Sequence, residues 1–301
     1  MEGVLSLAPS PEAAVLSEAS RRPIATSDGR IAGKLCEPAR DDESMPLVVC
    51  VHGSGCNSGY FDLASNSFVA AATERGMPVL LLDRPGHGAS GDAPPGSAID
   101  RGADAVGELL DALSASREDL RARPVALVGH SFGGAVALTF AAREPNELNV
   151  AIAAICVSGI GDLANADYVE SRRGATASPA ALWLFGPGSS YDWRGITALR
   201  AASDRWRAEE VDEVTGDWPR RWSRTVAAVT CPVHFRLAEH ERIWDARPHA
   251  IERIAAAFAR SARVDAAIAP DGGHLYEVHL RGPELIDAQL DFIRDAGSRP
   301  S

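Results

Sequence analysis

The sequence has no concentration of positive charge. Its 30 lysines and arginines stand against 41 aspartates and glutamates, which gives a formal net charge of -11, and the basic residues form no stripe along the chain. A phosphate backbone is bound by clustered lysine and arginine side chains. We therefore expect no nucleic-acid partner.

Long apolar runs are also missing. A helix that spans a bilayer needs about 20 consecutive apolar residues, and no segment approaches that length. The first ten residues, MEGVLSLAPS, have neither the basic start nor the apolar stretch of a secretory signal peptide. These two observations predict a cytoplasmic protein without a membrane partner.

Cysteine is scarce, and its spacing follows no disulfide or metal-binding pattern. The five cysteines are odd in number, and most lie inside apolar runs: Cys36, Cys50, Cys56, Cys156 and Cys231. Reduced, buried thiols are the simplest interpretation. Neither C-x-x-C nor H-E-x-x-H occurs, so we expect no metal and no other cofactor.

What the sequence does contain is the pattern of a covered parallel sheet. Four continuous apolar runs alternate with helical patterns: Leu47–Val51, Pro78–Leu82, Val125–Val128 and Val150–Val157. A continuous run, unlike an alternating one, indicates a strand that is buried on both faces. The order of strands and helices therefore predicts an α/β protein with a mostly parallel, doubly wound sheet.

The pattern of strands is interrupted once. Between residues 161 and 226 the strand runs stop, and five of the six tryptophans fall there among short helical patterns. The alternation resumes near Pro232. We expect residues 23–160 and 227–301 to form the core, residues 161–226 an inserted helical cap, and residues 1–22 an N-terminal extension.

A G-x-S-x-G pattern, Gly129-His130-Ser131-Phe132-Gly133, lies between a buried strand and a buried helix. A strand that turns into a helix so abruptly passes through a strained backbone angle, and glycines two positions either side avoid collisions. The serine at the apex is held in front of the sheet, close to helix-end amides. We predict that Ser131 is a nucleophile. The alternative is a glycine-rich turn that happens to contain a serine.

A serine hydroxyl needs an adjacent base. His274 follows the last predicted strand on the glycine loop Pro270-Asp271-Gly272-Gly273, and we predict that it is this base. The other seven histidines have structural explanations in loops, in packing or on helix surfaces. In particular, His130 is expected to point away from the turn that carries Ser131.

The acid that orients the histidine should follow the preceding strand. We predict Glu241 in this role, with Glu239 as the second choice. A further alternative treats both as solvated loop charges and assigns the role to Asp162, which follows an earlier strand.

An oxyanion that forms at the carbonyl needs N–H donors that are already in place. The backbone amide of Phe132, directly after the predicted nucleophile, is one candidate. The second is the amide of Ser54, in the loop His52-Gly53-Ser54-Gly55 that follows a neighbouring strand. A plain turn without a functional amide is the alternative.

Four motifs together resemble those of the α/β-hydrolase fold: H-G-S-G at 52–55, D-R-P-G-H-G-A-S at 83–90, G-H-S-F-G-G at 129–134 and G-G-H at 272–274. The resemblance covers residues 24–296. It implies an α/β-hydrolase fold with an inserted helical cap.

The same resemblance implies that Ser131 is the nucleophile and His274 the base. Glu241 stands where the family's G-x-x-D motif has its aspartate, and Ala238 replaces that motif's glycine. Epoxide hydrolases and haloalkane dehalogenases carry an aspartate at the position of Ser131, which argues against both activities. The H-G-S-G loop is also similar to that of C–C bond hydrolases.

These features predict a serine hydrolase that cleaves small to medium, largely apolar esters or thioesters through an acyl-enzyme, with a small acyl molecule as its partner. Trp183 and Phe185 in the cap are the predicted substrate-binding side chains, because aromatic rings supply apolar surface. Three alternatives remain: a C–C bond hydrolase of vinylogous diketones, an acyltransferase or lyase on the same fold, and a non-catalytic binding protein.

Overall fold

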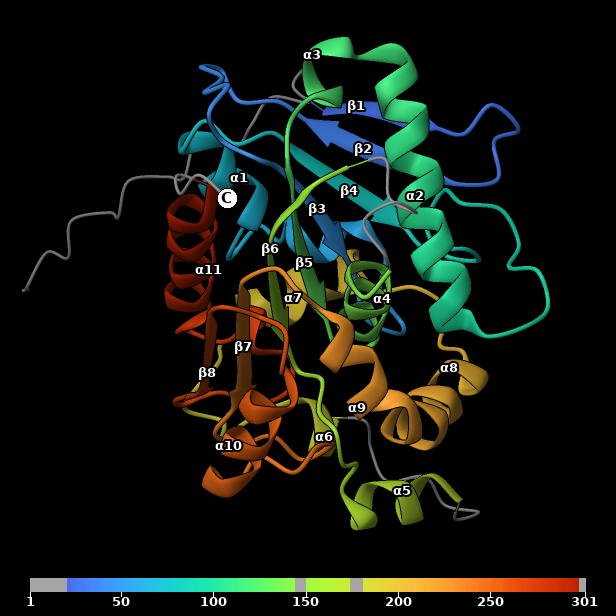
Figure 1. Ribbon diagram of the computed structural model, residues 1–301. Helices are drawn as coiled ribbons and strands as arrows, with labels where there is room; N and C mark the ends of the chain where they lie inside the picture. Colours follow the sequence, from blue (N-terminus) through green and yellow to red (C-terminus); the bar gives the residue numbers. More distant parts are fainter. Residues whose placement is uncertain (1–20, 144–149, 174–180, 298–301) are drawn as a thin grey trace, which may run out of the picture.

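The computed structural model describes residues 21–143, 150–173 and 181–297. Within these residues, eight strands form one sheet in the order β1-β2-β4-β3-β5-β6-β7-β8 (Figure 1). The strands are β1 (Arg21–Ala25), β2 (Ala32–Cys36), β3 (Leu47–Val51), β4 (Val79–Asp83), β5 (Val125–His130), β6 (Ile152–Ser158), β7 (Val233–Ala238) and β8 (Val264–Ala269). Strands β3 to β8 pair in parallel, and β2 runs antiparallel to both of its neighbours. The predicted, mostly parallel sheet is confirmed.

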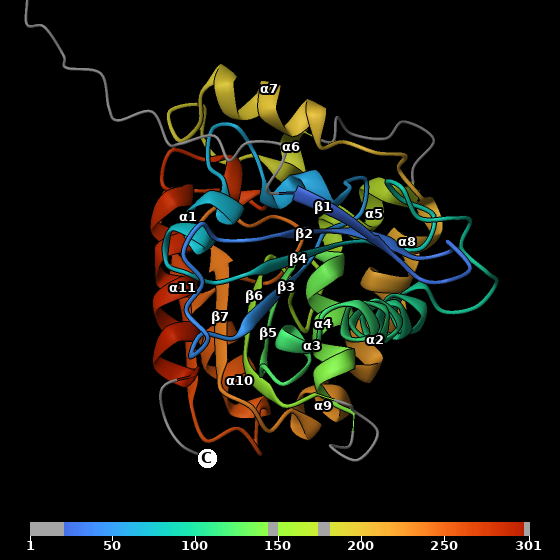
Figure 2. The ribbon, with the colours of Figure 1, turned by 90° about the horizontal axis from the view of Figure 1, so that it is seen from above.

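Helices cover both faces of this sheet. The described α-helices are α1 (Phe68–Glu74), α2 (Ala98–Ser116), α3 (Glu118–Arg121), α4 (Phe132–Ala141), α5 (Ala166–Arg173), α6 (Ala181–Leu184), α7 (Trp193–Ala201), α8 (Ala208–Asp212), α9 (Trp218–Ala228), α10 (Pro248–Ala257) and α11 (Gly282–Gly297). Side chains of α2, α4, α9 and α10 share one core cluster, and those of α1 and α11 share another. Figure 2 shows α2 and α4 on one side of the sheet and α1 and α11 on the other.

The central strand β3 is uniformly apolar in sequence because both of its faces are buried. Successive side chains of a strand point to opposite faces. Leu47, Val49 and Val51 therefore lie in the cluster with α2 and α4, whereas Val48 and Cys50 lie in the cluster with α1 and α11. All five residues of the strand are buried, as a doubly covered sheet requires.

Local signals fix several helix boundaries. The hydroxyl of Ser97 accepts a hydrogen bond from the amide of Asp100 at the start of α2, and Ser67 does the same for Ala70 at the start of α1. These are N-caps, which satisfy otherwise unpaired amides of the first turn. Among the helices that the structure describes, none combines the length and apolar composition that crossing a membrane requires.

The segment between β6 and β7 is helical, and its two halves pack differently. Helices α5 to α8 lie in front of the sheet, where each contributes a side chain to the cavity described below. Helix α9 instead packs on the sheet, because Trp218 and Trp222 join the core cluster and Trp222 contacts Phe258 edge to face. The last part of the predicted cap sequence is thus part of the layer that covers the sheet.

Candidate active site

The turn between β5 and α4 holds Ser131 in a strained conformation. Its φ is 51° and its ψ is -122°, a region that residues with a side chain adopt only at a cost of about 1–3 kcal/mol. Both flanking glycines are required by close backbone contacts. A Cβ atom at Gly129 would lie 2.6 Å from the carbonyl oxygen of Gly133, and one at Gly133 would collide with the carbonyl oxygen of Val51.

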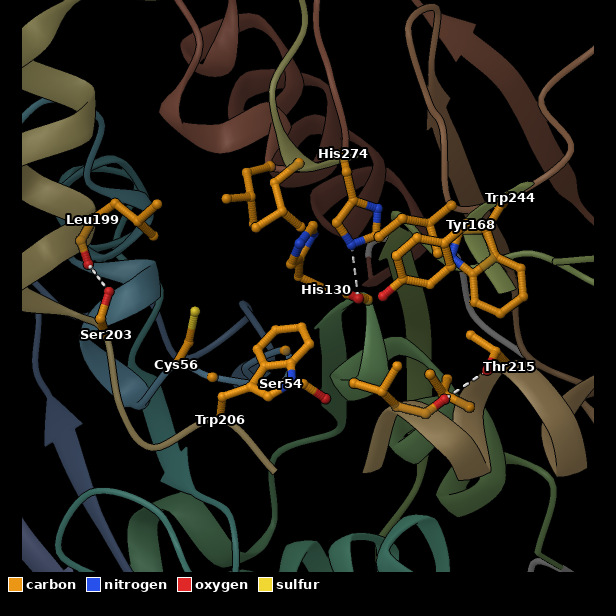
Figure 3. A pocket seen from close by; sticks show the side chains of 18 residues that line it. Ser54, Cys56, His130, Tyr168, Leu199, Ser203, Trp206, Thr215, Trp244 and His274 are labelled. Atoms are coloured by element: carbon orange, nitrogen blue, oxygen red, sulfur yellow. Dashed lines mark hydrogen bonds between the residues drawn. The ribbon is translucent and has the colours of Figure 1, made fainter. Parts of the chain in front are cut away.

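Three side chains from separate parts of the chain form one hydrogen-bonded row. His274 Nε2 lies 2.8 Å from Ser131 Oγ (Figure 3). On the other side of the ring, His274 Nδ1 lies 2.9 Å from Oε2 and 3.1 Å from Oε1 of Glu241. The imidazole and the carboxylate are both buried. The structure therefore brings together the three residues that the sequence suggested as nucleophile, base and acid.

Backbone amides hold the carboxylate of Glu241 in place. Its Oε1 accepts hydrogen bonds from the amides of Arg242 and Ile243 at 3.0 and 2.8 Å. The two alternative acids are engaged elsewhere. Asp162 forms a two-pronged ion pair with Arg253, at 2.5 and 2.9 Å, and Glu239 faces the loop after β8.

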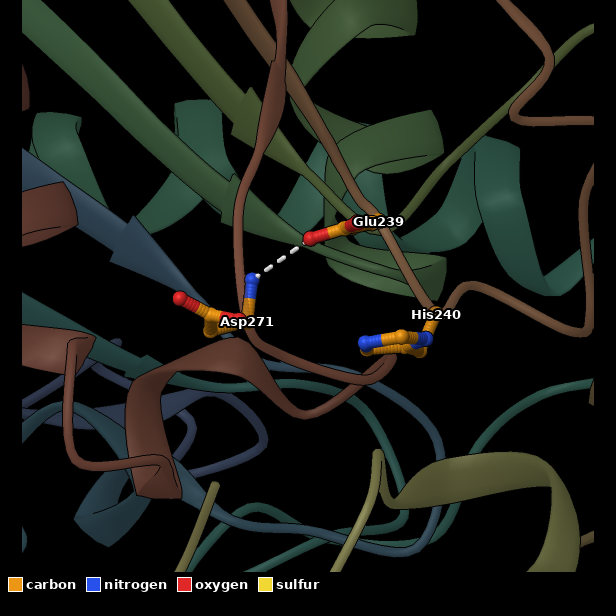
Figure 4. A group of neighbouring side chains, drawn as sticks. All are labelled: Glu239, His240 and Asp271. Atoms are coloured by element: carbon orange, nitrogen blue, oxygen red, sulfur yellow. Dashed lines mark hydrogen bonds between the residues drawn. The ribbon is translucent and has the colours of Figure 1, made fainter. Parts of the chain in front are cut away.

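A second cluster of titratable side chains lies on the loops after β7 and β8. Glu239, His240 and Asp271 bring their potential ligand atoms within 4.8 Å of one another (Figure 4). This spacing is compatible with a cation, and both carboxylates are exposed. Their visible contacts are structural: Glu239 Oε2 accepts from the amide of Asp271 at 3.0 Å, and the amide of His240 donates to the carbonyl of Gly272. These bonds join the loops that carry Glu241 and His274.

Both residues predicted to supply oxyanion donors belong to segments that adjoin Ser131. Phe132 is the first residue of α4, so its amide is at the amino end of that helix. The loop with Ser54 packs against the turn, since a Cβ atom at Gly53 would lie 3.2 Å from Ser131 Cβ. Ser54 lines the same cavity as Ser131. Its buried hydroxyl has no hydrogen-bond partner among the residues that the structure describes.

A cavity of about 150 Å³ opens in front of Ser131 and His274. Its wall is mostly apolar and combines side chains of the core with side chains of α5 to α8. The apolar members are Cys56, Tyr168, Leu184, Leu199, Trp206, Val211, Val214, Ile243, Trp244 and Leu275. Charged carboxylates and guanidinium groups are not part of this wall within the described residues.

The sequence profile of the α/β-hydrolase family matches residues 48–288. The chain belongs to this family. The matched range runs from β3 to α11 and includes every residue of the hydrogen-bonded row.

Curated proteins that are similar to part of the chain include a transferase component and an esterase. A segment of 127 residues, 42% of the chain, is 35% identical to the dihydrolipoyllysine-residue acetyltransferase component of the acetoin cleaving system of Pseudomonas putida, of which it covers 30%. A segment of 113 residues, 36% of the chain, is 34% identical to the pimeloyl-[acyl-carrier protein] methyl ester esterase of Neisseria meningitidis and covers 38% of it. The chain thus spans about a third of the length of these curated relatives.

The fold resembles that of solved α/β-hydrolase structures. A thermophilic esterase from Thermogutta terrifontis superimposes with a TM-score of 0.61 and 18% sequence identity, over 92% of this chain and 99% of that chain. At this identity the likeness concerns the fold.

Neither Trp183 nor Phe185 lines the cavity of this α/β-hydrolase. Trp183 packs edge to face against Tyr168, with ring centroids 5.3 Å apart, and Phe185 packs against Tyr191 at 5.0 Å. Leu184 between them lines the cavity instead. Trp183 and Leu184 are neighbours in α6, where successive residues point about 100° apart, so their side chains face different directions.

An outer cavity of about 720 Å³ lies behind the wall. It is lined by residues of the loops after β6 and β7, among them Leu163, Glu241 and Arg247. Trp244 lines both cavities, and it is the one residue shared by their two walls within the described chain. Trp244 is therefore the point at which the two cavities adjoin.

The sequence predicted that His130 points away from the turn that carries Ser131, and this prediction is wrong. It lines the inner cavity, and its ring centroid lies 5.1 Å from that of His274. The ring stacks on Tyr60 at 4.8 Å, and Nδ1 lies 3.1 Å from the hydroxyl of Ser158. A residue just before a sharp turn takes its direction from its neighbours in space, which local sequence does not reveal.

Glu277 is a buried carboxylate beneath this site that the sequence analysis missed. Its two oxygens accept hydrogen bonds from Tyr60 at 2.6 Å and Ser158 at 2.7 Å, and one lies 3.4 Å from His130 Nδ1. Burial alone would raise its pKa, but the charge of His130 and these hydrogen bonds lower the pKa to about 2. The one sequence signal was a carboxylate in the otherwise apolar stretch just after His274.

Proposed function

We propose that this α/β-hydrolase is a serine hydrolase that cleaves carboxylic esters or thioesters of small, largely apolar acyl groups. The observation that carries the proposal is the row Ser131–His274–Glu241 at hydrogen-bond distances, with Ser131 facing an apolar cavity. The similarity of part of the chain to a protein named as a methyl ester esterase supports it.

In the first half of the reaction, His274 Nε2 accepts the proton of Ser131 Oγ while that oxygen bonds to the substrate carbonyl carbon. The π electrons of the C=O bond move to its oxygen. The amides of Phe132 and Ser54 donate hydrogen bonds to this oxyanion. Glu241 holds the ring with Nδ1–H directed at itself and stabilises the imidazolium that forms.

The tetrahedral intermediate then collapses. The carbonyl re-forms, the bond to the leaving oxygen or sulfur breaks, and the imidazolium of His274 donates its proton to that atom. The alcohol or thiol leaves, and the acyl group stays on Ser131 as an ester. Water repeats both steps with His274 as base and then acid, which releases the carboxylic acid.

The inner cavity argues for a short acyl group. A dry, apolar cavity of roughly 150 Å³ accommodates a molecule the size of benzene, and the cavity here has about this volume. We therefore expect acyl chains on the order of six carbons or fewer. The part of residues 161–226 that covers Ser131 acts as a cap in this proposal, because Tyr168, Trp206 and Val214 supply the wall that a substrate would meet.

We also propose a cytoplasmic location. All five cysteines are buried free thiols, which is typical of proteins from a reducing compartment.

Fluorophosphonate labelling tests the serine mechanism. We expect the wild-type protein to be labelled at one residue, and Ser131→Ala to abolish both labelling and ester turnover, with turnover reduced by roughly 10³-fold or more. The matched control is Ser203→Ala, since Ser203 lines the same cavity but bonds to the carbonyl of Leu199. Labelling of Ser131→Ala at the wild-type rate would rule the assignment out.

A substrate panel tests the reaction class. Oxyesters and thioesters of increasing acyl length should be hydrolysed with a preference for short chains. Cleavage of a vinylogous diketone with no ester turnover would instead identify a C–C bond hydrolase.

A further inference from the structure

Arg84 lies at the end of β4 and is almost completely buried, with 1% of its surface exposed. Its guanidinium forms a two-pronged ion pair with Glu210, with NH1 2.7 Å from Oε1 and NH2 3.0 Å from Oε2. Two further hydrogen bonds go to backbone oxygens: Nε donates to the carbonyl of His52 at 3.0 Å, and NH2 donates to the carbonyl of Gly53 at 3.1 Å. Arg84 does not line the cavity.

The carbonyl of Gly53 belongs to the same peptide group as the amide of Ser54. Because a peptide group is planar and trans, its N–H points opposite to its C=O. A hydrogen bond that holds the Gly53 oxygen toward Arg84 therefore directs the Ser54 N–H away from Arg84. A charged donor on the oxygen also polarises the group and makes the N–H a stronger donor.

His52 reinforces this orientation. Burial and the charge of Arg84 hold the pKa of His52 well below its ordinary value, so its ring is neutral. Its Nε2 accepts the backbone amide of Arg84 at 3.1 Å. The proton of the neutral ring is then on Nδ1, which donates to the carbonyl of Gly53 at 2.9 Å. The oxygen of the Gly53–Ser54 peptide thus has two donors.

Arg84 also contacts the other proposed oxyanion donor. Its guanidinium carbon lies 4.5 Å from the centroid of the Phe132 ring, a cation–π distance. One buried cation thereby contacts both the peptide group that carries the Ser54 amide and the side chain of Phe132.

Glu210 comes from α8, in the segment that covers the cavity. It is 2% exposed, and its Oε1 also lies 2.9 Å from His87 Nε2. Burial by itself would raise its pKa, but the charge of Arg84 and the hydrogen bonds of His87 and Arg84 hold the pKa of Glu210 well below its usual range. The covering segment therefore places a full negative charge against the cation that holds the Ser54 peptide.

We propose that Arg84 and Glu210 are a positioning pair that orients the Ser54 amide of the oxyanion hole and couples this orientation to the segment covering the active site. The inference rests on the proposed serine-hydrolase function. A buried ion pair contributes little to stability compared with apolar residues of the same shape, so a role in positioning accounts for charges at this place. Arg84 acts through the peptide and does not touch the substrate.

The pair has a kinetic signature that a merely structural contact lacks. Loss of one oxyanion donor lowers kcat by roughly 10²–10³-fold. A misdirected Ser54 amide should therefore lower kcat by roughly 10–100-fold, with KM little changed. The inhibition constant of a trifluoromethyl ketone, which forms an oxyanion when Ser131 adds to it, should rise by the same factor.

The experiment compares Arg84→Lys and Glu210→Gln with the wild type. Arg84→Lys keeps the charge but loses the planar, multidentate geometry, and Glu210→Gln keeps the shape but loses the charge. Each rate is divided by the concentration of active sites measured by fluorophosphonate titration. The matched control is Arg221→Lys, which makes the same exchange in an ion pair with Asp100 between α9 and α2, outside the cavity wall, and should leave kcat unchanged.

The double variant adds an independent measurement. If the two residues act as one unit, the kcat of the double variant should be no lower than that of the more impaired single variant. If Arg84→Lys does not fold, the positioning role is tested with Glu210→Gln alone, by its kcat per active site and its inhibition constant for the trifluoromethyl ketone.

Two results would overturn the positioning role: unchanged kcat per active site despite a lower melting temperature, or a change in KM with the trifluoromethyl ketone constant unaltered. A failure of the serine-hydrolase proposal looks different, because the wild-type protein itself would then not be labelled.

Discussion

At the scale of single residues, the site depends on how each carboxylate is held. Glu241 is fixed by two backbone amides and faces His274, whereas Glu239 two positions earlier faces the amide of Asp271. The two side chains have the same chemistry and nearly the same place in the sequence. Glu241 contacts His274 of the hydrogen-bonded row, whereas Glu239 joins two loops.

This difference predicts opposite outcomes for two matched substitutions. Glu241→Gln should lower kcat by roughly 10³–10⁴-fold, because an amide neither fixes the required tautomer of His274 nor stabilises its cation. Glu239→Gln should leave kcat close to the wild-type value. Steady-state kinetics on a short-chain ester measures both, and the reverse ranking would transfer the role of acid to Glu239.

At the scale of structural elements, the loop after β7 performs two tasks at once. It carries Glu241 to His274, and three residues later it places Trp244 in the walls of both the inner and the outer cavity. The helices that cover the site supply the rest of the inner wall. Acyl length should therefore be limited by this loop as well as by the covering helices.

Trp244→Ala should join the two cavities. We expect kcat/KM for long acyl esters to rise relative to short ones by roughly tenfold or more, about 1.4 kcal/mol in relative transition-state stabilisation. The matched control is Trp183→Ala, which removes an indole that lines neither cavity. A series of esters of increasing chain length measures the ratio. An unchanged ratio in a folded Trp244→Ala variant would show that this indole does not limit acyl length.

At the scale of the whole molecule, the sheet joins segments that lie far apart in the chain. The buried carboxylate of Glu277, in the last connection of the fold, pairs with His130 at the end of β5 and Ser158 at the end of β6. Such a network contributes to stability only while the carboxylate is ionised. Acid should therefore weaken the whole fold through this group.

The sign of this effect follows from the shifted pKa. Folding lowers the pKa of Glu277 from its ordinary value of 4.5 to about 2. Its contribution is fully present above pH 4.5 and is lost as the pH falls toward 2. A shift of this size corresponds to about 3 kcal/mol at most. Urea unfolding at pH 7 and at about pH 3 should therefore show a smaller loss of unfolding free energy for Glu277→Gln than for the wild type.

The control is Glu252→Gln, an exposed residue of α10, which should lose as much stability on acidification as the wild type. An equal loss in all three proteins would mean that Glu277 does not couple folding to pH.

Several features were determined by local sequence. The continuous apolar runs predicted buried parallel strands, because a strand covered on both faces cannot alternate. The glycines around Ser131 predicted a strained turn, since close backbone contacts leave no room for a Cβ atom there. The positions of His274 and Glu241 after successive strands predicted that they would meet Ser131, because parallel strands end at the same edge of a sheet.

Other features were decided only by the tertiary structure. The sequence favoured Trp183 and Phe185 as cavity residues, but Trp206 and Trp244 line the cavity. Which aromatic ring faces inward depends on how distant segments pack against one another, which the residues beside each ring do not specify. The pairing of Arg84 with Glu210 likewise depends on a covering segment that returns over a loop formed much earlier in the chain. Local sequence specifies strands, turns and caps through short-range sterics, whereas contacts between distant segments exist only once the sheet has brought them together.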